Sequence, residues 1–392
     1  MMQLVTTLFT GLAMGTTIIL GQMIGGGKKK ESEDVIGGSI CFFLVLAVIV
    51  TVLMLIVTVP FAHLMQTPQE AFSQTIYYVR ICSGGIIFIV AYNVLGSIFR
   101  GLGDSKTPLL TVAIACVCNI VGDLLFVAVL GMRASGAAIA TIMAQAISVF
   151  ICVWLIKRKG LPLPFGIQNI RFHRNEIAKV FKTGAPIALQ DSLVVLSFLV
   201  INSIVNGLGV IFSAGVGVAE KVCAFIMLVP MSFSQSLSAF VAQNVGAGNP
   251  ARARKSMECA MGMSIVAGVI LAYMAYFHGD VLGAIFTKDP EVILASADYM
   301  KAYAIDTLMV SFLFCFVGYF NGCGYTLFVM IQGLVGAFLV RIPISRFMSR
   351  VPDMNLFKIG LATSASTVVQ IILCAAWFVL TLKKHGEAVR SE

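Results

Sequence analysis

Hydrophobic residues form long runs along the whole chain, and polar residues gather in the short stretches between them. A run of about 20 apolar residues crosses the hydrocarbon core of a bilayer as an α-helix. The runs lack the ten-residue alternation of membrane β-strands. The pattern therefore predicts an all-α polytopic membrane protein with eleven transmembrane helices, near residues 3–24, 36–60, 77–99, 108–130, 134–157, 185–206, 211–241, 257–278, 299–320, 325–348 and 357–382.

The composition agrees with a membrane location and offers little for enzyme chemistry. Hydrophobic residues make up 59% of the 392 residues and charged residues 11%, well below the roughly 25% of a soluble domain. The cysteines lie mostly inside apolar runs, and the sequence contains no CxxC pair, HExxH motif, phosphate-binding loop or GxSxG motif. We therefore expect no enzyme activity, no zinc site and no cofactor.

The basic residues gather at alternate ends of the predicted helices. If loop 28–30 is cytoplasmic, eighteen Lys and Arg residues lie on the cytoplasmic side and five on the other. This asymmetry follows the positive-inside rule and places the C-terminus in the cytoplasm. It also accounts for the net charge of +9 without nucleic acid, because the basic loops are short and lack stacking aromatic residues.

The longest polar segment divides the chain into two groups of apolar runs. Ile170, Ile177, Val180 and Phe181 fall roughly on one helical face, which predicts an amphipathic linker helix on the cytoplasmic membrane surface. A solvated connector is the alternative. The expected division is an N-terminal lobe at 1–157, a linker at 158–183, a C-terminal lobe at 184–384 and a cytoplasmic tail at 385–392.

The sequence repeats itself at an offset of 221 residues. The segment at 21–28 (GQMIGGGK) matches the segment at 242–249 (AQNVGAGN), which pairs Gln22 with Gln243, Gly25 with Gly246 and Gly27 with Gly248. At the same offset FRGLG (99–103) matches FNGCG (320–324), and Tyr78 matches Tyr299. The shared offset indicates two related halves, whose glycines suit left-handed or unusual backbone at helix ends.

The two halves differ in their number of helices. Both glycine motifs fall on the cytoplasmic side, which predicts parallel halves related by an axis along the membrane normal. Five predicted helices precede the linker and six follow it, so the helix at 185–206 has no counterpart in the first half. We expect two six-helix bundles, the first of which lacks its first helix; a compact protein of five plus six helices is the alternative.

These motifs resemble those of the MATE (multidrug and toxic compound extrusion) transporters. The resemblance extends over nearly the whole chain and is closest to the bacterial MepA-like branch. It rests on AQNVGAGN with the basic ARARKS that follows it, FRGLGDSKTP (99–108), NIVGD (119–123), GAPIALQ (184–190) and GYFNGCG (318–324).

The resemblance implies both a fold and a function. The fold has twelve helices in two six-helix lobes around a central cavity. The function is export of organic cations and drugs across the bacterial inner membrane, in exchange for Na⁺ or H⁺. In many members the first helix carries a cation-binding aspartate, so its absence here puts an intact ion site in doubt.

An acid inside the fourth predicted helix is the sharpest candidate for chemistry. An ionisable group within a span costs about 2.5–3.5 kcal/mol on insertion scales. Asn119 lies four residues before Asp123, on the same helical face, and the two offer hard oxygen ligands for Na⁺ or a site for H⁺. Thr141 on the next helix adds a hydroxyl, and Asn93 is a weaker addition. By resemblance, Asn119, Asp123 and Thr141 match the cation site of the family's first lobe; a buried structural Asp held by helix-packing hydrogen bonds is the alternative.

The second half contains its own polar residues within or near spans. Acids that face a central cavity can attract a cationic substrate and release it on protonation; salt bridges between helices are the alternative. Arg341 also lies within a predicted span, and the sequence identifies no partner for it. The candidates for a polar cavity in the second lobe are Gln190, Asp191, Asn202, Glu220 and Asp306.

Two other functions fit the same fold. A flippase for lipid-linked oligosaccharides would be expected to carry several Arg or Lys residues for phosphates, whereas intramembrane acids outnumber deep bases here. A truncated remnant that inserts without coupling to an ion is the other alternative. The expected partners are small organic cations and the lipid bilayer, with no nucleic acid, and the protein is expected to be a monomer.

Overall fold

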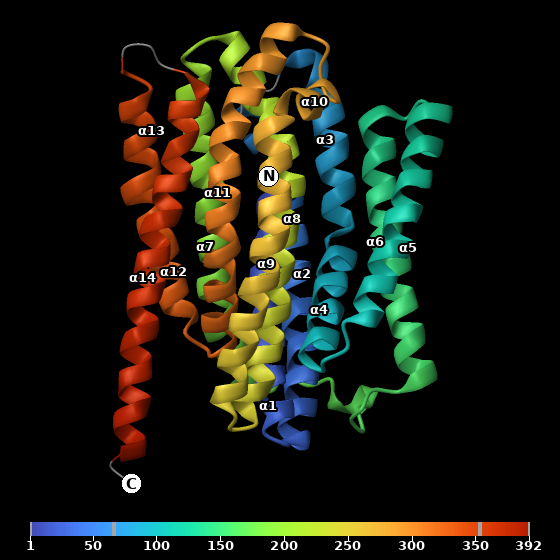
Figure 1. Cartoon of the computed structure of the whole chain (residues 1–392). Coiled ribbons are helices and arrows are strands. Elements are labelled where there is room, and N and C mark those ends of the chain that lie inside the picture. The colour runs from blue at the N-terminus through green and yellow to red at the C-terminus, as the bar shows by residue number, and fades with distance from the viewer. Residues whose placement is uncertain (1, 65–67, 352–354, 391–392) are drawn as a thin grey trace. The chain divides into compact units, whose positions relative to one another are not determined.

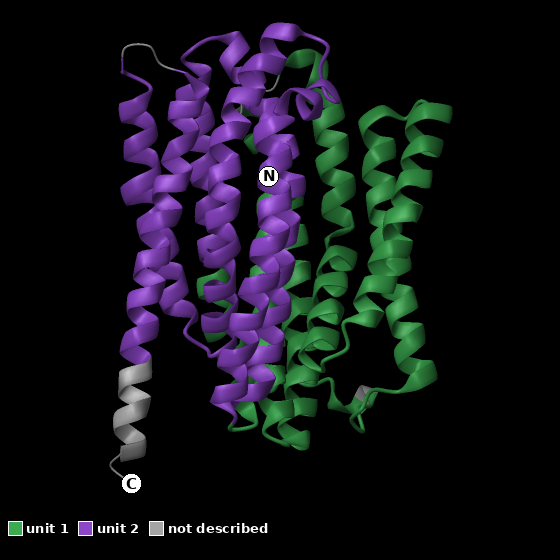
Figure 2. Ribbon diagram, in the orientation of Figure 1, with its two compact units in different colours: residues 1–188, 246–248 green, residues 189–245, 249–392 purple. Residues whose placement is uncertain are grey.

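The computed structural model describes residues 2–64, 68–351 and 355–390. The regular elements within these ranges are all helices. The chain divides into two compact units: unit 1 contains Met1–Ala188 and Gly246–Gly248, and unit 2 contains Leu189–Val245 and Asn249–Glu392 (Figure 2).

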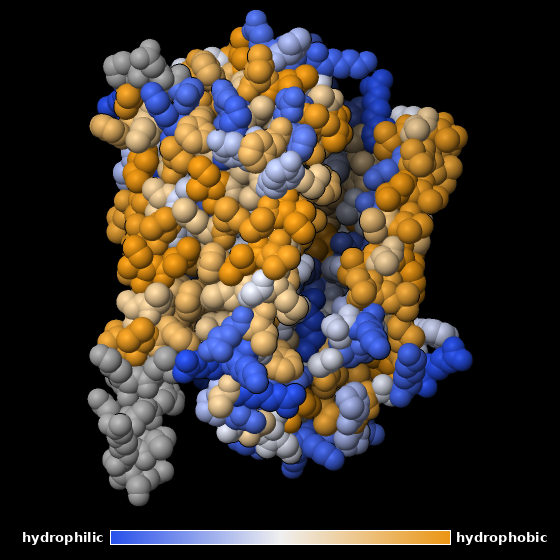
Figure 3. Space-filling view, in the orientation of Figure 1, coloured by the Kyte–Doolittle hydropathy of each residue, from blue (hydrophilic) through white to orange (hydrophobic). Residues whose placement is uncertain are grey.

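The prediction of an all-α polytopic membrane protein is confirmed. Among the described residues, ten helices are long and apolar enough to cross a membrane. A bent pair, Gln69–Gly84 (α3) and Ile86–Gly101 (α4), makes eleven if it counts as one span, and its two helices meet at an angle of 49°. On the face seen in Figure 3, hydrophobic residues cover the middle of the helices, and hydrophilic residues gather near their ends.

Unit 1 contains the helices of the first half of the chain (Figure 1). Its core is built from large apolar side chains that are almost fully buried, among them Phe9, Ile18, Phe43 and Ile86. Besides α3 and α4, its elements are α1 (Met2–Gly25), α2 (Lys29–Leu64), α5 (Lys106–Asp123), the π-helix η1 (Leu124–Val129), α6 (Arg133–Lys159), the 3₁₀ turn η2 (Ile167–Asn169) and the first part of α7 (Arg174–Asn206).

The second part of the predicted linker is not a separate helix. Residues 174–183 continue directly into the following span, and α7 passes Pro186 without a break. The first turns of α7 pack tightly on α1, because a Cβ added at Gly15 would lie 2.4 Å from the carbonyl oxygen of Val180. Val180 is accordingly 1% exposed. The apolar residues that suggested a membrane-surface helix therefore pack, at least at Val180, against another helix.

Unit 2 contains the rest of α7 and the helices that follow it. Its core includes Ile201, Tyr299, Met300 and Leu356, each nearly fully buried. Its elements are α8 (Val210–Gly246), α9 (Pro250–Phe277), the short α10 (Gly279–Ala284), α11 (Pro290–Gly322), α12 (Thr326–Leu334), the π-helix η3 (Val335–Arg341), α13 (Ile342–Met348) and α14 (Leu356–Arg390). The expected tail at 385–392 is helical as far as Arg390, and its last two residues lie outside the described residues.

The sequence repeat is also a repeat of backbone conformation. Gly27 and Gly248 have φ angles of +69° and +68°, and Gly103 and Gly324 have +86° and +89°. All four glycines follow helix ends in the left-handed region, where other residues are strained. Each of these ends is closed by the same six-residue backbone hydrogen bond, donated by Lys28, Asn249, Asp104 and Tyr325.

A contact between helices repeats at the same offset. The Thr17 hydroxyl on α1 donates to the carbonyl oxygen of Ser97 on α4 at 3.0 Å, and the Ser238 hydroxyl on α8 donates to the carbonyl oxygen of Gly318 on α11 at 3.0 Å. Both donors and both acceptors are 221 residues apart. The two halves therefore share helix packing as well as motifs, as the sequence predicts.

One helix differs between the halves. In unit 1 it is broken at Gly85, where an added Cβ would lie 2.4 Å from a side-chain carbon of Ile142. The equivalent position in unit 2 is Asp306, in the middle of the unbroken helix α11. The sequence predicts a span near 77–99, and the structure has a bent pair of helices there; an apolar run does not reveal the bend.

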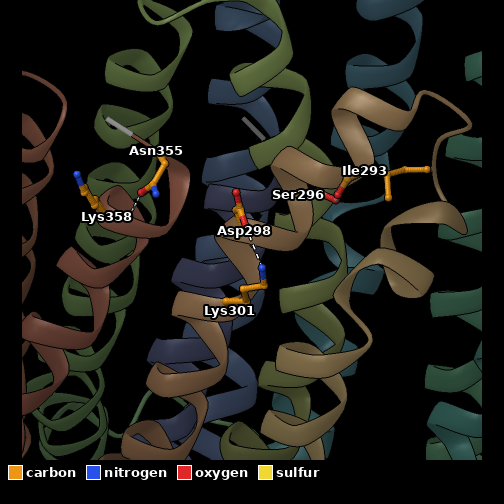
Figure 4. Close-up of polar contacts among 6 residues, drawn as sticks. All are labelled: Ile293, Ser296, Asp298, Lys301, Asn355 and Lys358. Atoms are coloured by element: carbon orange, nitrogen blue, oxygen red, sulfur yellow. Dashed lines mark hydrogen bonds and ion pairs between the residues drawn. The ribbon is translucent and has the colours of Figure 1, made fainter. Parts of the chain in front are cut away.

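Figure 4 shows polar contacts in the first turns of α11 and at the start of α14 in unit 2. The Lys301 amine lies 3.0 Å from the Asp298 carboxylate on α11, and the Asn355 side chain accepts a hydrogen bond from the backbone N–H of Lys358 at the start of α14. The Ser296 hydroxyl donates to the carbonyl oxygen of Ile293. Both ion-pair partners are largely exposed, so this pair contributes little to stability.

Candidate functional site

The site predicted in unit 1 lies at the end of α5. Asn119 and Asp123 are one helical turn apart and both are half-buried. The Nδ2 atom of Asn119 and the Oδ1 atom of Asp123 are buried and have no hydrogen-bond partner among the described residues. Buried polar atoms are usually paired, and the unpaired carboxylate oxygen is an acceptor that a cation or a proton can engage.

The position of Asp123 relative to the next helix is set by two small residues. A Cβ added at Gly122 would lie 2.9 Å from the Cβ of Ala140, so α5 and α6 are in close contact at this pair. Asp123 and Thr141 each follow one member of the pair. The Thr141 hydroxyl donates to the carbonyl oxygen of Ala137 on its own helix at 2.9 Å, which leaves its lone pairs available.

Two further residues at this site were missed in the sequence analysis. Gln145 lies one turn after Thr141, and its Oε1 atom is buried without a partner among the described residues. Tyr78 on α3 lies within electrostatic range of Asp123. The sequence repeat could have identified Tyr78 as a site residue, because it matches Tyr299. The four-residue spacing between Thr141 and Gln145 could have identified Gln145.

Asn93 takes part in a different contact. Its Oδ1 atom accepts a hydrogen bond from the Thr10 hydroxyl on α1 at 3.0 Å, and its Nδ2 atom donates to the carbonyl oxygen of Ile89 at 2.8 Å. Both ends of the amide are therefore engaged. The structure ties Asn93 to α1 and shows no hydrogen bond from it to Asn119, Asp123 or Thr141.

The backbone changes its geometry directly after Asp123. The α-helix α5 gives way to the π-helix η1, and π-helical turns often mark functional sites. A carboxylate, two amides and a hydroxyl are hard oxygen ligands suited to Na⁺, and the carboxylate can instead take a proton. Within the described residues no three His, Cys, Asp or Glu side chains group together as a metal cluster, so a multi-acid divalent site has no support.

Two acids of unit 2, Glu220 and Asp306, differ because they have hydrogen-bond partners. The Asn202 amide on α7 donates to Glu220 on α8 at 3.2 Å. The Thr367 hydroxyl on α14 donates to Oδ1 of Asp306 at 2.6 Å, and Asp306 is 1% exposed. The structure therefore forms two hydrogen-bonded pairs, one between Asn202 and Glu220 and the other between Thr367 and Asp306.

Arg341, for which the sequence identified no partner, lies at the end of η3 and is 6% exposed. Its Nη1 atom lies 3.3 Å from the Ser197 hydroxyl, and its guanidinium carbon lies 4.6 Å from the centre of the Phe198 ring. Its charge interacts with that of Asp306, although no N–O distance between Arg341 and a carboxylate of the described residues is 4.0 Å or less. The partners come from α7, which sequence spacing could not indicate.

The other predicted residues of unit 2 lie at the start of its part of α7. Gln190 packs against α12, since a Cβ added at Gly333 would lie 2.9 Å from the Gln190 amide. Asp191 is half-buried and has no hydrogen bond or ion pair with the described residues. Lys221, next to Glu220, is exposed, and its amine lies 5.6 Å from the centre of the Phe286 ring.

The glycines of the repeated motif allow close backbone contact as well as turns. A Cβ added at Gly246 would lie 2.0 Å from the carbonyl oxygen of Gln22, within unit 1. Any side chain at this position would therefore separate the end of α1 from Gly246. Gly25 and Gly246 are the last residues of α1 and α8, and Gly27 and Gly248 supply the left-handed turns.

Neither of the two best-formed cavities contains these acids. A small cavity of about 30 Å³ in unit 1 lies beside Asn93 and Arg100. An apolar pocket of about 390 Å³ in unit 2 lies between α8, α9 and α10, with Phe225, Met274 and Phe286 in its walls. The polar side chains of the candidate sites therefore lie outside both cavities.

Comparison with known proteins finds that this chain is similar to membrane transporters. The MatE family model matches residues 1–125 and 186–346. The probable multidrug resistance protein YpnP of Bacillus subtilis (strain 168) is 28% identical over 286 residues, which are 73% of this chain and 64% of YpnP. The multidrug export protein MepA of Staphylococcus saprophyticus is 22% identical over 286 residues, which are 72% of this chain and 63% of MepA. The matches thus span less than two thirds of the length of these two relatives.

A solved structure supports the fold. The outward-facing conformation of a multidrug resistance MATE family transporter of the MOP superfamily has a TM-score of 0.91 to this chain at 19% identity, covering 97% of this chain and 85% of that one. At this identity the likeness shows the fold alone.

Proposed function

The chain belongs to the MatE family, and we propose that it is a secondary active transporter that exports organic cations by antiport with Na⁺ or H⁺. The names of its relatives support a multidrug role, since they include multidrug resistance and multidrug export proteins. The multi-pass fold supports membrane transport.

The unpaired Oδ1 atom of the Asp123 carboxylate, inside a membrane span, carries the proposal. A charged or polar side chain inside a span persists when it has a partner or a function, because its burial is otherwise unfavourable. Asp123 has no structural partner at Oδ1 among the described residues, and neighbouring oxygens complete a site for a small cation. Binding of Na⁺ or H⁺ would then change the interactions of α5 with α6 and favour one conformation of the transporter.

The cargo is proposed from the sign of the buried charges. Asp191, Glu220 and Asp306 offer negative charge in unit 2, against the single deep base Arg341 that the sequence analysis identified. This balance favours a cationic substrate over the phosphate of a lipid-linked sugar. The protein would act as a monomer in the bacterial inner membrane, with its linker and C-terminus in the cytoplasm and with lobes at 1–157 and 184–384 moving in alternating access.

Purified protein in liposomes tests this proposal. The lumen is loaded with a fluorescent lipophilic cation such as ethidium, and Na⁺ or proton gradients are imposed separately. We expect one gradient to accelerate dye movement and its collapse by an ionophore to stop it. Dye movement that is the same with and without either gradient would contradict antiport. It would favour the alternative of a truncated remnant that inserts into the membrane without coupling to an ion.

A further inference from the structure

An apolar pocket in unit 2 has no part in the proposed ion site. Its volume is about 390 Å³, within the usual range of ligand-binding pockets, and its walls come from α8, α9, α10 and the two residues that follow α10. All of its lining side chains are apolar. Phe225 and Ile285 in its walls are 67% and 71% exposed, so the pocket opens on the surface of the helices. An occupant can therefore enter from outside the protein.

The pocket lies near the end of the span formed by α9. Leu271 and Met274 line it, and α9 ends at Phe277, so this wall lies within about 9 Å of the helix end. Tyr276 and Phe277 on the last turn are exposed, and their ring centres lie 5.0 Å apart. Exposed tyrosines are typical of the membrane–water interface. The pocket is therefore at the depth of lipid tails, directly below the headgroups, and under the predicted orientation these belong to the outer leaflet.

Lys221 places a positive charge beside the pocket. Its amine lies 5.6 Å from the centre of the Phe286 ring, which forms part of the wall, and its side chain is exposed. Within the described residues Lys221 forms no ion pair, and the neighbouring Glu220 accepts a hydrogen bond from Asn202 on α7. A lysine near the end of a span extends its amine to the headgroup level, where it can pair with a phosphate.

The charge and the apolar walls together select the occupant. A cation such as the proposed cargo is repelled by Lys221, whereas an amphiphile with an anionic head is attracted. Lipid tails already surround the span, so apolar walls alone give no preference between one phospholipid and another. We propose that the pocket binds one acyl chain of an anionic phospholipid, whose phosphate pairs with Lys221. The chain fills a space whose walls otherwise lack contacts, and the charge gives the preference.

The test is fluorescence quenching by a brominated lipid. Purified full-length protein is placed in nanodiscs of phosphatidylcholine with an increasing fraction of phosphatidylglycerol that carries bromine on its acyl chains. Trp154 and Trp377 are replaced by Phe, and one tryptophan is introduced, by Phe225→Trp in the pocket wall or by Ile270→Trp as the matched control. Ile270 is 58% exposed on α9 and does not line the pocket, so it reports on ordinary lipid contact.

The expected result is a difference between the two reporters that depends on Lys221. Phe225→Trp should be half-quenched at about one third of the phosphatidylglycerol fraction that Ile270→Trp requires, because an exposed ion pair changes affinity by a factor of a few. Lys221→Gln should bring the two curves together, and Lys221→Arg should keep them apart. High salt screens an exposed charge and should reduce the difference without any substitution at Lys221.

Several results would overturn the proposal. Coincident curves at the two positions would show that the pocket contains only ordinary bilayer lipid. The proposal also fails if brominated lipid does not quench Phe225→Trp, or if the difference survives both Lys221→Gln and high salt. Displacement of the brominated chain by tetraphenylphosphonium, a lipophilic cation, would assign the pocket to the cargo instead. None of these outcomes depends on gradient-driven export, so the proposed function and this site are tested separately.

Discussion

The buried and half-buried acids of the two units differ in their hydrogen bonding. In unit 1, Asp123 and Asn119 each have a buried polar atom without a partner among the described residues. In unit 2, Asp306 accepts a hydrogen bond from Thr367, Glu220 accepts one from Asn202, and Arg341 adds a positive charge. The two related halves thus differ in hydrogen bonding: unit 1 has an unpaired carboxylate oxygen, and in unit 2 Asp306 and Glu220 are each hydrogen-bonded. Under the proposed function, Asp123 is a binding residue, and Asp306 and Glu220 are structural.

The helix that carries Asp306 in unit 2 also differs in shape from its counterpart in unit 1. Unit 1 breaks it at Gly85, and unit 2 continues it through Asp306. Hydrogen bonds between buried polar groups rigidify their surroundings, so we expect the Thr367–Asp306 contact to restrain α11 and α14. The unpaired Asp123 oxygen places no such restraint on unit 1.

The largest expected effect on stability is the loss of the acid in unit 2. Asp306→Ala removes the buried partner of the Thr367 hydroxyl, which should cost about 3 kcal/mol. Asp123→Ala breaks no observed hydrogen bond and should cost less than about 1 kcal/mol. Thermal unfolding of both variants measures the contrast. Equal losses of stability would show that Asp123 is also structural.

The next largest expected effect on stability comes from disturbing the close packing of α5 on α6 at the unit 1 site. Gly122→Val forces side-chain carbons onto Ala140, which should cost about 1–3 kcal/mol and separate Asp123 from Thr141. Gly262 on α9 has no atom within 4 Å of an added Cβ, so Gly262→Val is the matched control and should keep both stability and ion dependence. Ion-dependent dye export and thermal unfolding are measured together for the two variants. A Gly122→Val protein with normal ion dependence would exclude this contact as part of the site.

Two threonines sharpen the comparison further. Thr367→Val removes the hydrogen bond to a buried carboxylate and should cost about 1.5–3 kcal/mol. Thr141 bonds only the carbonyl oxygen of Ala137 on its own helix, so Thr141→Val should leave stability nearly unchanged and weaken cation affinity about tenfold. Cation titrations and unfolding curves separate the two roles. A Thr141→Val protein with unchanged affinity would remove Thr141 from the ligand set.

The smallest effect lies outside the spans, at the start of α5. The Asp104 carboxylate accepts hydrogen bonds from the backbone N–H groups of Lys106 and Thr107 and from the Thr107 hydroxyl. Burial alone would raise the pKa of Asp104, but these bonds and the charge of Lys159 lower it below its ordinary value. The equivalent residue of unit 2 is Tyr325, which makes no such cap.

The sign of the pH dependence follows from that lowered pKa. The stabilising contribution of Asp104 is fully present above its unfolded pKa of about 3.9 and is lost as the pH falls through the lower folded value. Asp104→Ala should therefore cost about 1 kcal/mol near neutral pH, and the difference should vanish in strong acid. Ser105→Ala removes no cap hydrogen bond and serves as the control. A pH-independent difference would contradict the assignment to the carboxylate.

Much of the fold could be predicted from the sequence because bilayer thickness and repetition leave strong signals. The apolar runs correspond to ten spans and one bent pair, and the offset of 221 residues recurs in the left-handed glycines and in the Thr17 and Ser238 hydrogen bonds. Hydropathy counts residues and does not measure crowding. The break at Gly85 and the continuation of residues 174–184 into the α7 span were therefore not predicted.

The candidate sites were predicted in part. Asn119 and Asp123 stand one turn apart on one helix, and such local spacing can be recognised in a sequence. Tyr78, Gln145 and the α7 partners of Arg341 come from other elements, and only tertiary packing brings them near. The two π-helices, which follow Asp123 and end at Arg341, leave no pattern that sequence periodicity detects.

The central claim is that unit 1 carries the coupling site and unit 2 does not. Its most direct test is gradient-driven export of a fluorescent cation from liposomes by Asp123→Asn and Asp306→Asn proteins, compared at equal amounts of folded protein. The account predicts that Asp123→Asn loses the gradient-driven component while Asp306→Asn, which retains an oxygen for Thr367, keeps it. Gradient-driven export that survives in Asp123→Asn and disappears in Asp306→Asn would contradict the account.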